Sequence, residues 1–143
     1  MPARLRRMLP ALWAGVLLCI AAIAAPAAFA ALPSAEAGQV VSRIFVREGW
    51  LSLAAALLLL GLERRHGPPG RFNTALLWAT VACTLLGYFV VRALLPAARV
   101  GQGLFSFGQL HLISTVFYGL KTWLVLALAW RMAAVEISRP PSS

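Results

Sequence analysis

The chain has 143 residues, of which 61% are hydrophobic and 12% are charged, and its formal net charge is +9 at pH 7. Soluble domains contain roughly 45–50% apolar and about 25% charged residues, so this composition excludes an ordinary soluble protein and an appended soluble enzyme domain. Nucleic-acid binding is not expected either, because the arginines stand in short clusters between apolar runs, a pattern that sets membrane topology. All four acidic residues are glutamates, which leaves paired-carboxylate catalysis almost nothing to use, so no enzyme is predicted.

The first apolar run covers residues 8–32 and follows an arginine-rich start. A basic start, an apolar stretch and the small-residue sequence Ala28-Phe29-Ala30 also suit a secretory signal that is cleaved. The apolar core of such a signal is typically about 7–15 residues long, whereas this run has 25. We therefore favour a retained transmembrane helix over a cleaved signal, with Pro26 disturbing the helix locally because proline lacks a backbone N–H.

The second helix is predicted over residues 34–64, with Ser34 as its N-cap. Its strongly apolar part, residues 50–62, has only 13 residues and is too short to cross a bilayer core of roughly 30 Å. A spanning length of about 20 residues takes in Arg43, Arg47 and Glu48. The first turns of this helix are therefore expected to project from the membrane.

A loop rich in charge, glycine and proline covers residues 63–71 and precedes a third helix, which is predicted over residues 73–95. Hydroxyl side chains recur in the third helix at four-residue spacing, at Thr80, Thr84 and Tyr88. A turn is predicted from Pro96 to residue 103. The last residues, 138–143, are predicted to be disordered.

The last apolar run covers residues 104–130, carries one full charge at Lys121 and is followed by Arg131, so the fourth helix is predicted over residues 104–131. At about 100° per residue, most of its polar side chains fall on one arc about 120° wide. They are His111, Ser114, Thr115, Tyr118, Lys121 and Thr122. An apolar helix with a single polar stripe is expected to turn that stripe towards neighbouring helices and its other faces towards lipid.

These elements predict an all-α fold, a four-helix transmembrane bundle that forms one domain over residues 1–137. With four spans, the N-terminus, the 63–73 loop and the C-terminus share one side and hold eight of the 13 lysines and arginines, against four on the other side. The side richer in Lys and Arg is normally cytoplasmic. We therefore expect a multi-pass protein of the inner (cytoplasmic) membrane with both termini in the cytoplasm.

One ion pair is predicted inside the membrane, between Glu48 and Lys121. Counting about 1.5 Å per residue from the cytoplasmic ends places Lys121 roughly 14 Å deep and Glu48 roughly 21 Å deep. Two long side chains can bridge this offset of about 7 Å. A lone charge near the bilayer centre costs from about 3 to over 10 kcal/mol unless a partner relieves it, so each residue needs the other.

The other polar residues have two interpretations. In the structural one, the Ser, Thr and Tyr side chains form hydrogen bonds between helices. In the functional one, His111, Tyr118, Lys121 and the face formed by Thr80, Thr84 and Tyr88 line a path for a cation or small solute. His111 with cysteines and methionines could also bind a soft ion such as Cu(I), but both cysteines lie nearer the midplane.

No metal site or cofactor is therefore predicted. Cys19 and Cys83 lack CxxC spacing and are expected to be small buried apolar residues.

Four short segments stand in a recognisable order. They are Leu12-Trp13-Ala14-Gly15, Pro26-Ala27-Ala28-Phe29, Ala37-Gly38 with Phe45, and Phe107 with His111 and Ser114. Together they resemble the transmembrane protein 205-like family, a domain of unknown function in small bacterial membrane proteins. The resemblance implies four transmembrane helices with the first retained, and Phe107, His111 and Ser114 as the polar opening of the last. Tyr118 stands where this family commonly has an amide, and a looser similarity to copper-resistance membrane proteins keeps a soft metal ion in view.

The sequence thus predicts a non-enzymatic membrane protein whose intramembrane polar residues are mainly structural, in a scaffold or assembly role. The alternative is a small transporter or exporter of a cation or small solute, with His111 functional rather than structural. The bilayer is the one partner that the sequence implies directly. A homo-oligomer is a further expectation for the transporter, because four short helices enclose little space.

Overall fold

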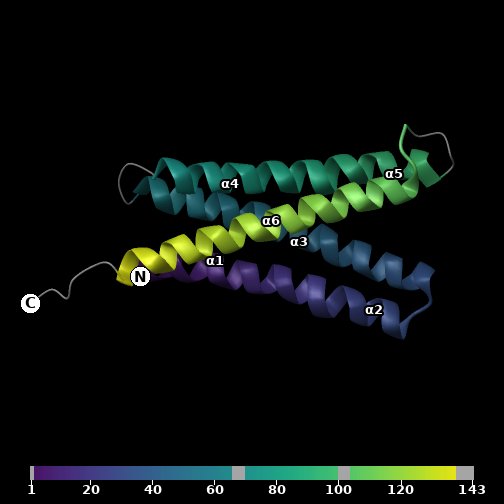
Figure 1. The fold of residues 1–143 in the computed structure, drawn as a ribbon, viewed down its shortest axis with the longest axis horizontal. Coiled ribbons are helices and arrows are strands. Elements are labelled where there is room, and N and C mark those ends of the chain that lie inside the picture. The colour runs from purple at the N-terminus through teal and green to yellow at the C-terminus, as the bar shows by residue number, and fades with distance from the viewer. Residues whose placement is uncertain (1, 66–69, 100–103, 138–143) are drawn as a thin grey trace, which may run out of the picture.

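The computed structural model describes residues 2–65, 70–99 and 104–137, which form four long helical rods (Figure 1). The first rod consists of α1 (Pro2–Cys19), the π-helix η1 (Ile20–Ala24) and α2 (Ala25–Ala31), and the second is α3 (Ser34–Arg65). The third consists of α4 (Arg71–Thr84), the π-helix η2 (Leu85–Val90) and α5 (Val91–Arg99), and the fourth is α6 (Phe107–Ile137). The predicted all-α fold is confirmed, and the described residues contain no strand.

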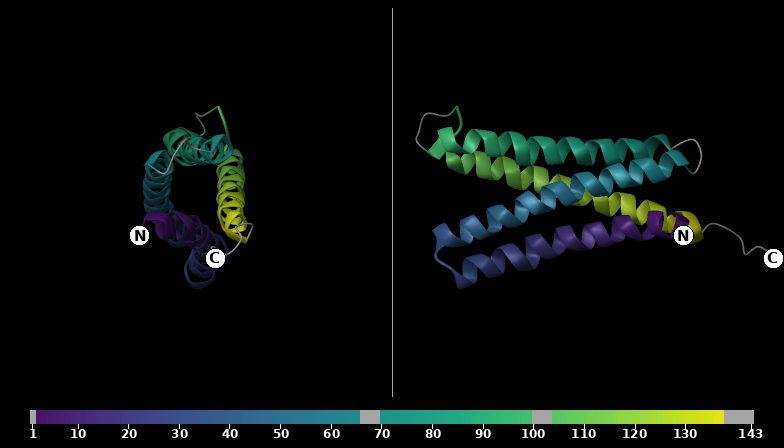
Figure 2. Two further views of the ribbon diagram at one scale, coloured as in Figure 1. Left: turned by 90° about the vertical axis from the view of Figure 1, so that its left-hand side faces the viewer. Right: turned by 180° about the vertical axis from the view of Figure 1, so that it is seen from behind.

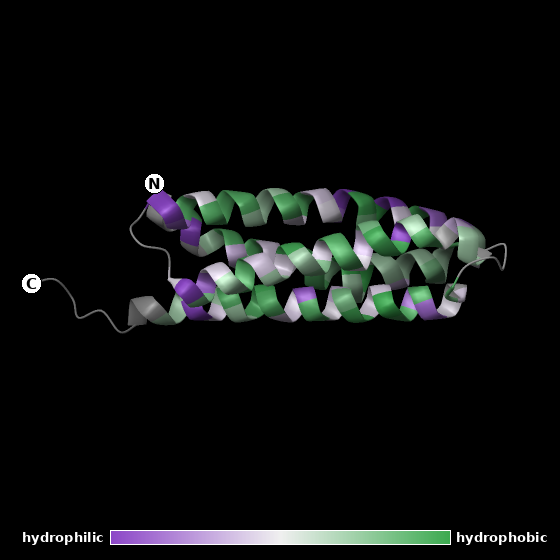
Figure 3. Ribbon diagram, turned by 90° about the horizontal axis from the view of Figure 1, so that it is seen from above, coloured by the Kyte–Doolittle hydropathy of each residue, from purple (hydrophilic) through white to green (hydrophobic). Residues whose placement is uncertain are grey.

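Each rod contains a segment that is long and apolar enough to cross a membrane. By length and composition these segments are Met8–Ala31, Ser34–Arg65, Arg71–Leu94 and Gly108–Ala134. Large apolar side chains cover the outside of the rods, including Trp50, Leu57, Leu112 and Trp123, each more than 60% exposed. Figure 3 shows hydrophobic residues along the length of the rods and a concentration of hydrophilic ones near the N-terminus. This exterior suits lipid.

The first rod departs from a regular α-helix just before Pro26, as the sequence predicts. Proline has no N–H to donate, so the carbonyl of Ala22 loses its partner four residues ahead. The wider turn of η1 takes up this defect, and α2 then begins with Pro26 in its first turn, where a missing N–H costs nothing.

The predicted turn at Pro96 is wrong, because α5 continues through this proline to Arg99. A proline inside a helix removes one hydrogen bond and bends the rod, but close to a helix end it does not have to terminate it. Residues 100–103 and the predicted disordered tail, 138–143, lie outside the described residues.

The start of α6 is fixed by a reciprocal cap that the sequence analysis missed. The backbone N–H of Ser106 donates to Oε1 of Gln109 at 2.9 Å, and the N–H of Gln109 donates to Oγ of Ser106 at 3.3 Å. This Ser-x-x-Gln arrangement satisfies two donors that a helix start leaves open. It explains why α6 begins at Phe107 rather than at residue 104.

Seen along their length, the rods follow one another around the bundle in the order α1, α3, α4, α6, with α6 closing against α1 (Figure 2). The start of α1 and the end of α6, here called the chain ends, lie at the same end of the bundle (Figure 1). At the opposite end the rods separate into two pairs, α2 with the first half of α3 and α5 with the first half of α6.

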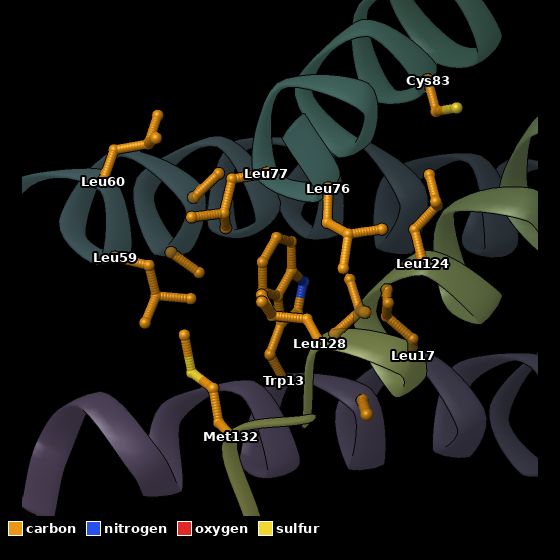
Figure 4. Packing of buried hydrophobic residues seen from close by; sticks show 14 residues of the cluster. Trp13, Leu17, Leu59, Leu60, Leu76, Leu77, Cys83, Leu124, Leu128 and Met132 are labelled. Atoms are coloured by element: carbon orange, nitrogen blue, oxygen red, sulfur yellow. The ribbon is translucent and has the colours of Figure 1, made fainter. Parts of the chain in front are cut away.

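The hydrophobic core occupies the half of the bundle nearer the chain ends. Its residues come from all four rods (Figure 4): Trp13, Ala14, Leu17, Ala55, Ala56, Leu59, Leu60, Leu76, Leu77, Cys83, Leu124, Val125, Leu128 and Met132. Alanines at positions 14, 55 and 56 allow neighbouring rods to approach closely, which favours association of helices in lipid. The polar network described next lies where this core gives way to the diverging half.

Candidate functional site

The centre of the candidate site is an ion pair between α3 and α6. Nζ of Lys121 donates to both carboxylate oxygens of Glu48, at 2.7 Å to each. Both side chains are buried, with residue exposures of 5% for Glu48 and 3% for Lys121. The structure thus brings together the two residues that the sequence singles out as an intramembrane pair.

The direct contact differs from the axial offset of about 7 Å inferred from the sequence. That offset assumed that the rods end at Leu62 and Trp130, whereas α3 ends at Arg65 and α6 at Ile137. From these ends Glu48 lies about 26 Å and Lys121 about 24 Å along its rod, at 1.5 Å per residue. The two residues are therefore level.

Two further side chains extend this pair to α1. Ser52, one turn after Glu48 on α3, donates its hydroxyl to Oε1 of Glu48. The indole Nε1 of Trp13 donates to Oγ of Ser52 at 3.0 Å, and both residues are buried. A continuous chain of hydrogen bonds therefore joins α1, α3 and α6, and we call these four residues, Trp13, Glu48, Ser52 and Lys121, the polar network.

Tyr118 forms a second connection between α6 and α1, next to the network. Its hydroxyl donates to the backbone carbonyl of Leu17 at 2.9 Å. Its ring packs edge-to-face on Phe45 with centroids 5.0 Å apart, and Nζ of Lys121 lies 4.8 Å from the centroid of the same ring. An aromatic face attracts a cation, so Tyr118 adds to the stabilisation of the Lys121 charge.

The network is electrically neutral and its members satisfy one another. The Glu48 carboxylate accepts from Lys121 and Ser52, and the Ser52 oxygen accepts from Trp13. A buried charge is tolerated only when it is paired and its remaining hydrogen-bonding capacity is used. Here the two charges are paired, and Lys121 and Glu48 each make at least two hydrogen bonds within the chain.

The rest of the predicted stripe on α6 is divided. Thr122 is buried and Ser114 half-buried, but the side chains of His111 and Thr115 are exposed. The prediction of an inward-facing stripe is therefore wrong for these two residues. They lie in the first half of α6, where the rods have separated and fewer neighbours are available.

The threonines do not bond between helices. Thr80 and Thr84 are buried in α4, and their hydroxyls donate to the carbonyls of Leu76 and Thr80 of the same helix, at 2.8 and 2.9 Å. Thr115 and Thr122 do the same on α6, to His111 and Tyr118. The predicted interhelical role of threonine is wrong. Each hydroxyl reaches the backbone carbonyl four residues earlier in its own helix, and this oxygen has a second lone pair that can accept the bond.

Tyr88 also bonds within its own rod, since its hydroxyl accepts from Arg92. Its ring contacts Phe89 and lies close to Gly49 of α3. Among the described residues, the face formed by Thr80, Thr84 and Tyr88 therefore forms no hydrogen bond with the network.

A second ion pair, missed by the sequence analysis, lies near the chain ends. Nε of Arg6 is 3.4 Å from Oε1 of Glu63, which is 4% exposed while Arg6 is about one third exposed. The sequence predicts Glu63 in the loop over residues 63–71, but α3 continues to Arg65. The available signal was helical spacing, because Glu63 follows Glu48 by 15 residues, which at about 100° each brings it within about 60° of the direction of Glu48.

The described residues contain no group of three or more His, Cys, Asp or Glu that could hold a metal ion. Cys83 is buried, as predicted, but the prediction is wrong for Cys19, which is exposed on the first rod. His66 lies outside the described residues.

A family model described as "Domain of unknown function (DUF4149)" matches residues 8–102. This match covers most of the first three rods, including Trp13, Glu48 and Ser52, and ends before α6. No curated protein and no solved structure matches the chain.

Proposed function

From the premise that the chain belongs to the DUF4149 family, a domain of unknown function, we propose that it is a non-enzymatic integral membrane protein with a scaffold or assembly role. The observation that carries this proposal is the closure of the polar network. Lys121, Glu48, Ser52 and Trp13 bond to one another and so hold three rods in one arrangement. A transport site must exchange such bonds for bonds to a solute, whereas here each network residue already bonds to another residue of the network.

The finer family assignment is part of this proposal. The motifs at Trp13, Pro26, Phe45 and His111 support placing the chain with the transmembrane protein 205-like family, within the wider family of unknown function. An alignment in which these positions fail to coincide with that family's motifs would remove the finer assignment and leave the wider one.

We propose that the protein resides in the inner membrane with both termini in the cytoplasm. Arginines near the chain ends and the 63–73 loop outnumber those at the other end of the bundle, and such an excess marks the cytoplasmic side. A green fluorescent protein fused to the C-terminus should fluoresce, and an alkaline phosphatase fused there should be inactive. The opposite pair of results would reverse the orientation.

The alternative function, a transporter or exporter of a cation or small solute in a homo-oligomer, is favoured by one observation. His111 and Thr115 are exposed on α6 in the half where the rods separate, so polar side chains lie outside the closed network. Such residues in a membrane span often mark a solute path. A soft metal ion such as Cu(I) is the cargo that a histidine would suit best.

Flux measurements separate the two functions. The purified protein is placed in sealed vesicles that contain reporters for protons, K⁺ or Cu(I), and is compared with the variants His111→Ala and Tyr118→Phe. Val116→Ala, at an exposed apolar position of α6, is the control. The scaffold role predicts no flux above protein-free vesicles for any variant. Tyr118→Phe should lower the free energy of unfolding by about 1 kcal/mol, because one hydrogen bond to Leu17 is lost.

If the natural sequence shows flux, and His111→Ala abolishes this flux without changing the unfolding midpoint, the scaffold role is wrong and the protein is a transporter.

A further inference from the structure

A groove lies on the outer face of α3, away from the polar network. Its volume is about 230 Å³, and it is lined by Leu57, Leu58, Gly61, Leu62 and Arg65. Leu57, Gly61 and Arg65 recur every four residues, so they form one stripe along the helix. At about 100° per residue, Leu57 and Gly61 lie about 180° and about 140° around the helix from Glu48, which places the groove on the exterior of the bundle.

Gly61 creates the hollow. A Cβ atom at Gly61 would meet nothing within 4 Å, so the missing side chain leaves space that no other part of the described chain fills. Leu57 and Leu58 on its border are 61% and 48% exposed. In a bilayer this space faces hydrocarbon. If it stayed empty, the side chains that line it would lose dispersion contacts on that side.

Charge at one end of the groove selects the occupant. The lining is apolar except for Arg65, which is the last residue of α3 and is exposed. Among the described side chains, Glu63 pairs with Arg6 and Glu48 with Lys121, so neither neutralises Arg65. A guanidinium binds phosphate in a bidentate fashion, and basic pockets at the ends of membrane helices bind anionic head groups.

We propose that this groove binds one anionic phospholipid, with a fatty-acyl chain over Gly61 and the phosphate on Arg65. Apolar contact alone gives no preference, because every lipid offers an acyl chain. The guanidinium of Arg65 at the interface supplies the selectivity for a net negative head group, and Gly61 supplies the shape. The site is separate from the polar network and does not depend on the scaffold role.

Native mass spectrometry tests the site. The protein is freed of lipid in detergent and then offered equal amounts of phosphatidylglycerol and phosphatidylcholine with identical acyl chains. The natural sequence should retain the anionic lipid about fivefold better, the factor that corresponds to about 1 kcal/mol for one cation at the interface. Arg65→Gln should reduce this ratio to about one, and Gly61→Leu should reduce retention of both lipids.

Two matched variants serve as controls. Arg64→Gln removes the same charge one residue away, and Gly119→Leu fills a position on α6 that is equally open. Both should behave like the natural sequence. Equal losses in Arg64→Gln and Arg65→Gln would overturn the proposal in favour of general attraction to the basic end. If the natural sequence retains no lipid but forms a dimer, and Gly61→Leu abolishes this dimer, the groove binds a second copy of the chain. This result would also overturn the proposal.

Discussion

Replacing Lys121 by methionine should lower the free energy of unfolding by about 3 kcal/mol, the usual cost of leaving one member of a buried ion pair without its partner. Glu48 would remain 5% exposed, with Ser52 as its one donor among the described residues. Methionine keeps nearly the volume of lysine, so the effect reports charge rather than packing. Unfolding of the protein in mixed micelles, followed by tryptophan fluorescence, measures the change.

Neutralising both residues gives the control. The double variant Glu48→Gln with Lys121→Met should be more stable than either single variant by at least about 2 kcal/mol, because no isolated charge remains. Glu36→Gln, at the exposed start of α3, should change nothing by comparison. If the two single effects simply add in the double variant, the residues do not interact in the membrane and the polar network is wrong.

Replacing Gly87 by alanine should lower the free energy of unfolding by about 2 kcal/mol, although alanine is ordinarily the better helix former. Gly87 lies in η2, directly against Phe117 of α6, and a Cβ at this position would clash with Cβ of Phe117 and lie 3.0 Å from its Cγ. A Cβ atom is held by the backbone and cannot turn away. The helices themselves would have to separate.

Gly119→Ala is the matched control, because a Cβ there meets nothing within 4 Å. It should be neutral or stabilise by up to about 1 kcal/mol, which is the difference between glycine and alanine in a helix. Introducing Phe117→Ala together with Gly87→Ala should not restore stability, since alanine retains the clashing Cβ. Full recovery in that double variant would show that the aromatic ring, and not the close approach of α6 to η2, limits this position.

The rods could be predicted from the sequence because a bilayer admits few alternatives. Each span needs about 20 predominantly apolar residues, and three runs have them, while the run at residues 50–62 reaches this length only with the charged turns before it. The four segments coincide with the four rods. The Glu48–Lys121 pair could be predicted for a related reason. Lipid makes an isolated charge so costly that an acid and a cation near the middle of the spans must find each other.

What could not be predicted depends on how the rods are inclined and on which atoms meet. The residues next to Trp13 and Ser52 in the sequence do not indicate that this indole and this hydroxyl form a hydrogen bond between two helices. The acceptor for Tyr118 is a backbone carbonyl, which every residue has, so the sequence carries no signal for Leu17. The exposure of His111 follows from the separation of the rods, and a helical wheel treats all turns of a helix alike.

Exchanging the two charges tests the central claim, that a closed ion pair fastens α3 to α6 within the membrane. Glu48→Lys and Lys121→Glu should each prevent folded protein from accumulating, because each places two like charges together. The exchanged double variant should fold, since the Ser52 oxygen can accept from a lysine while its hydroxyl turns elsewhere. Recovery of a cooperative unfolding transition in the double variant is the predicted result. An exchanged protein as unstable as either reversal would contradict the pair and, with it, the proposal that the network holds the bundle together.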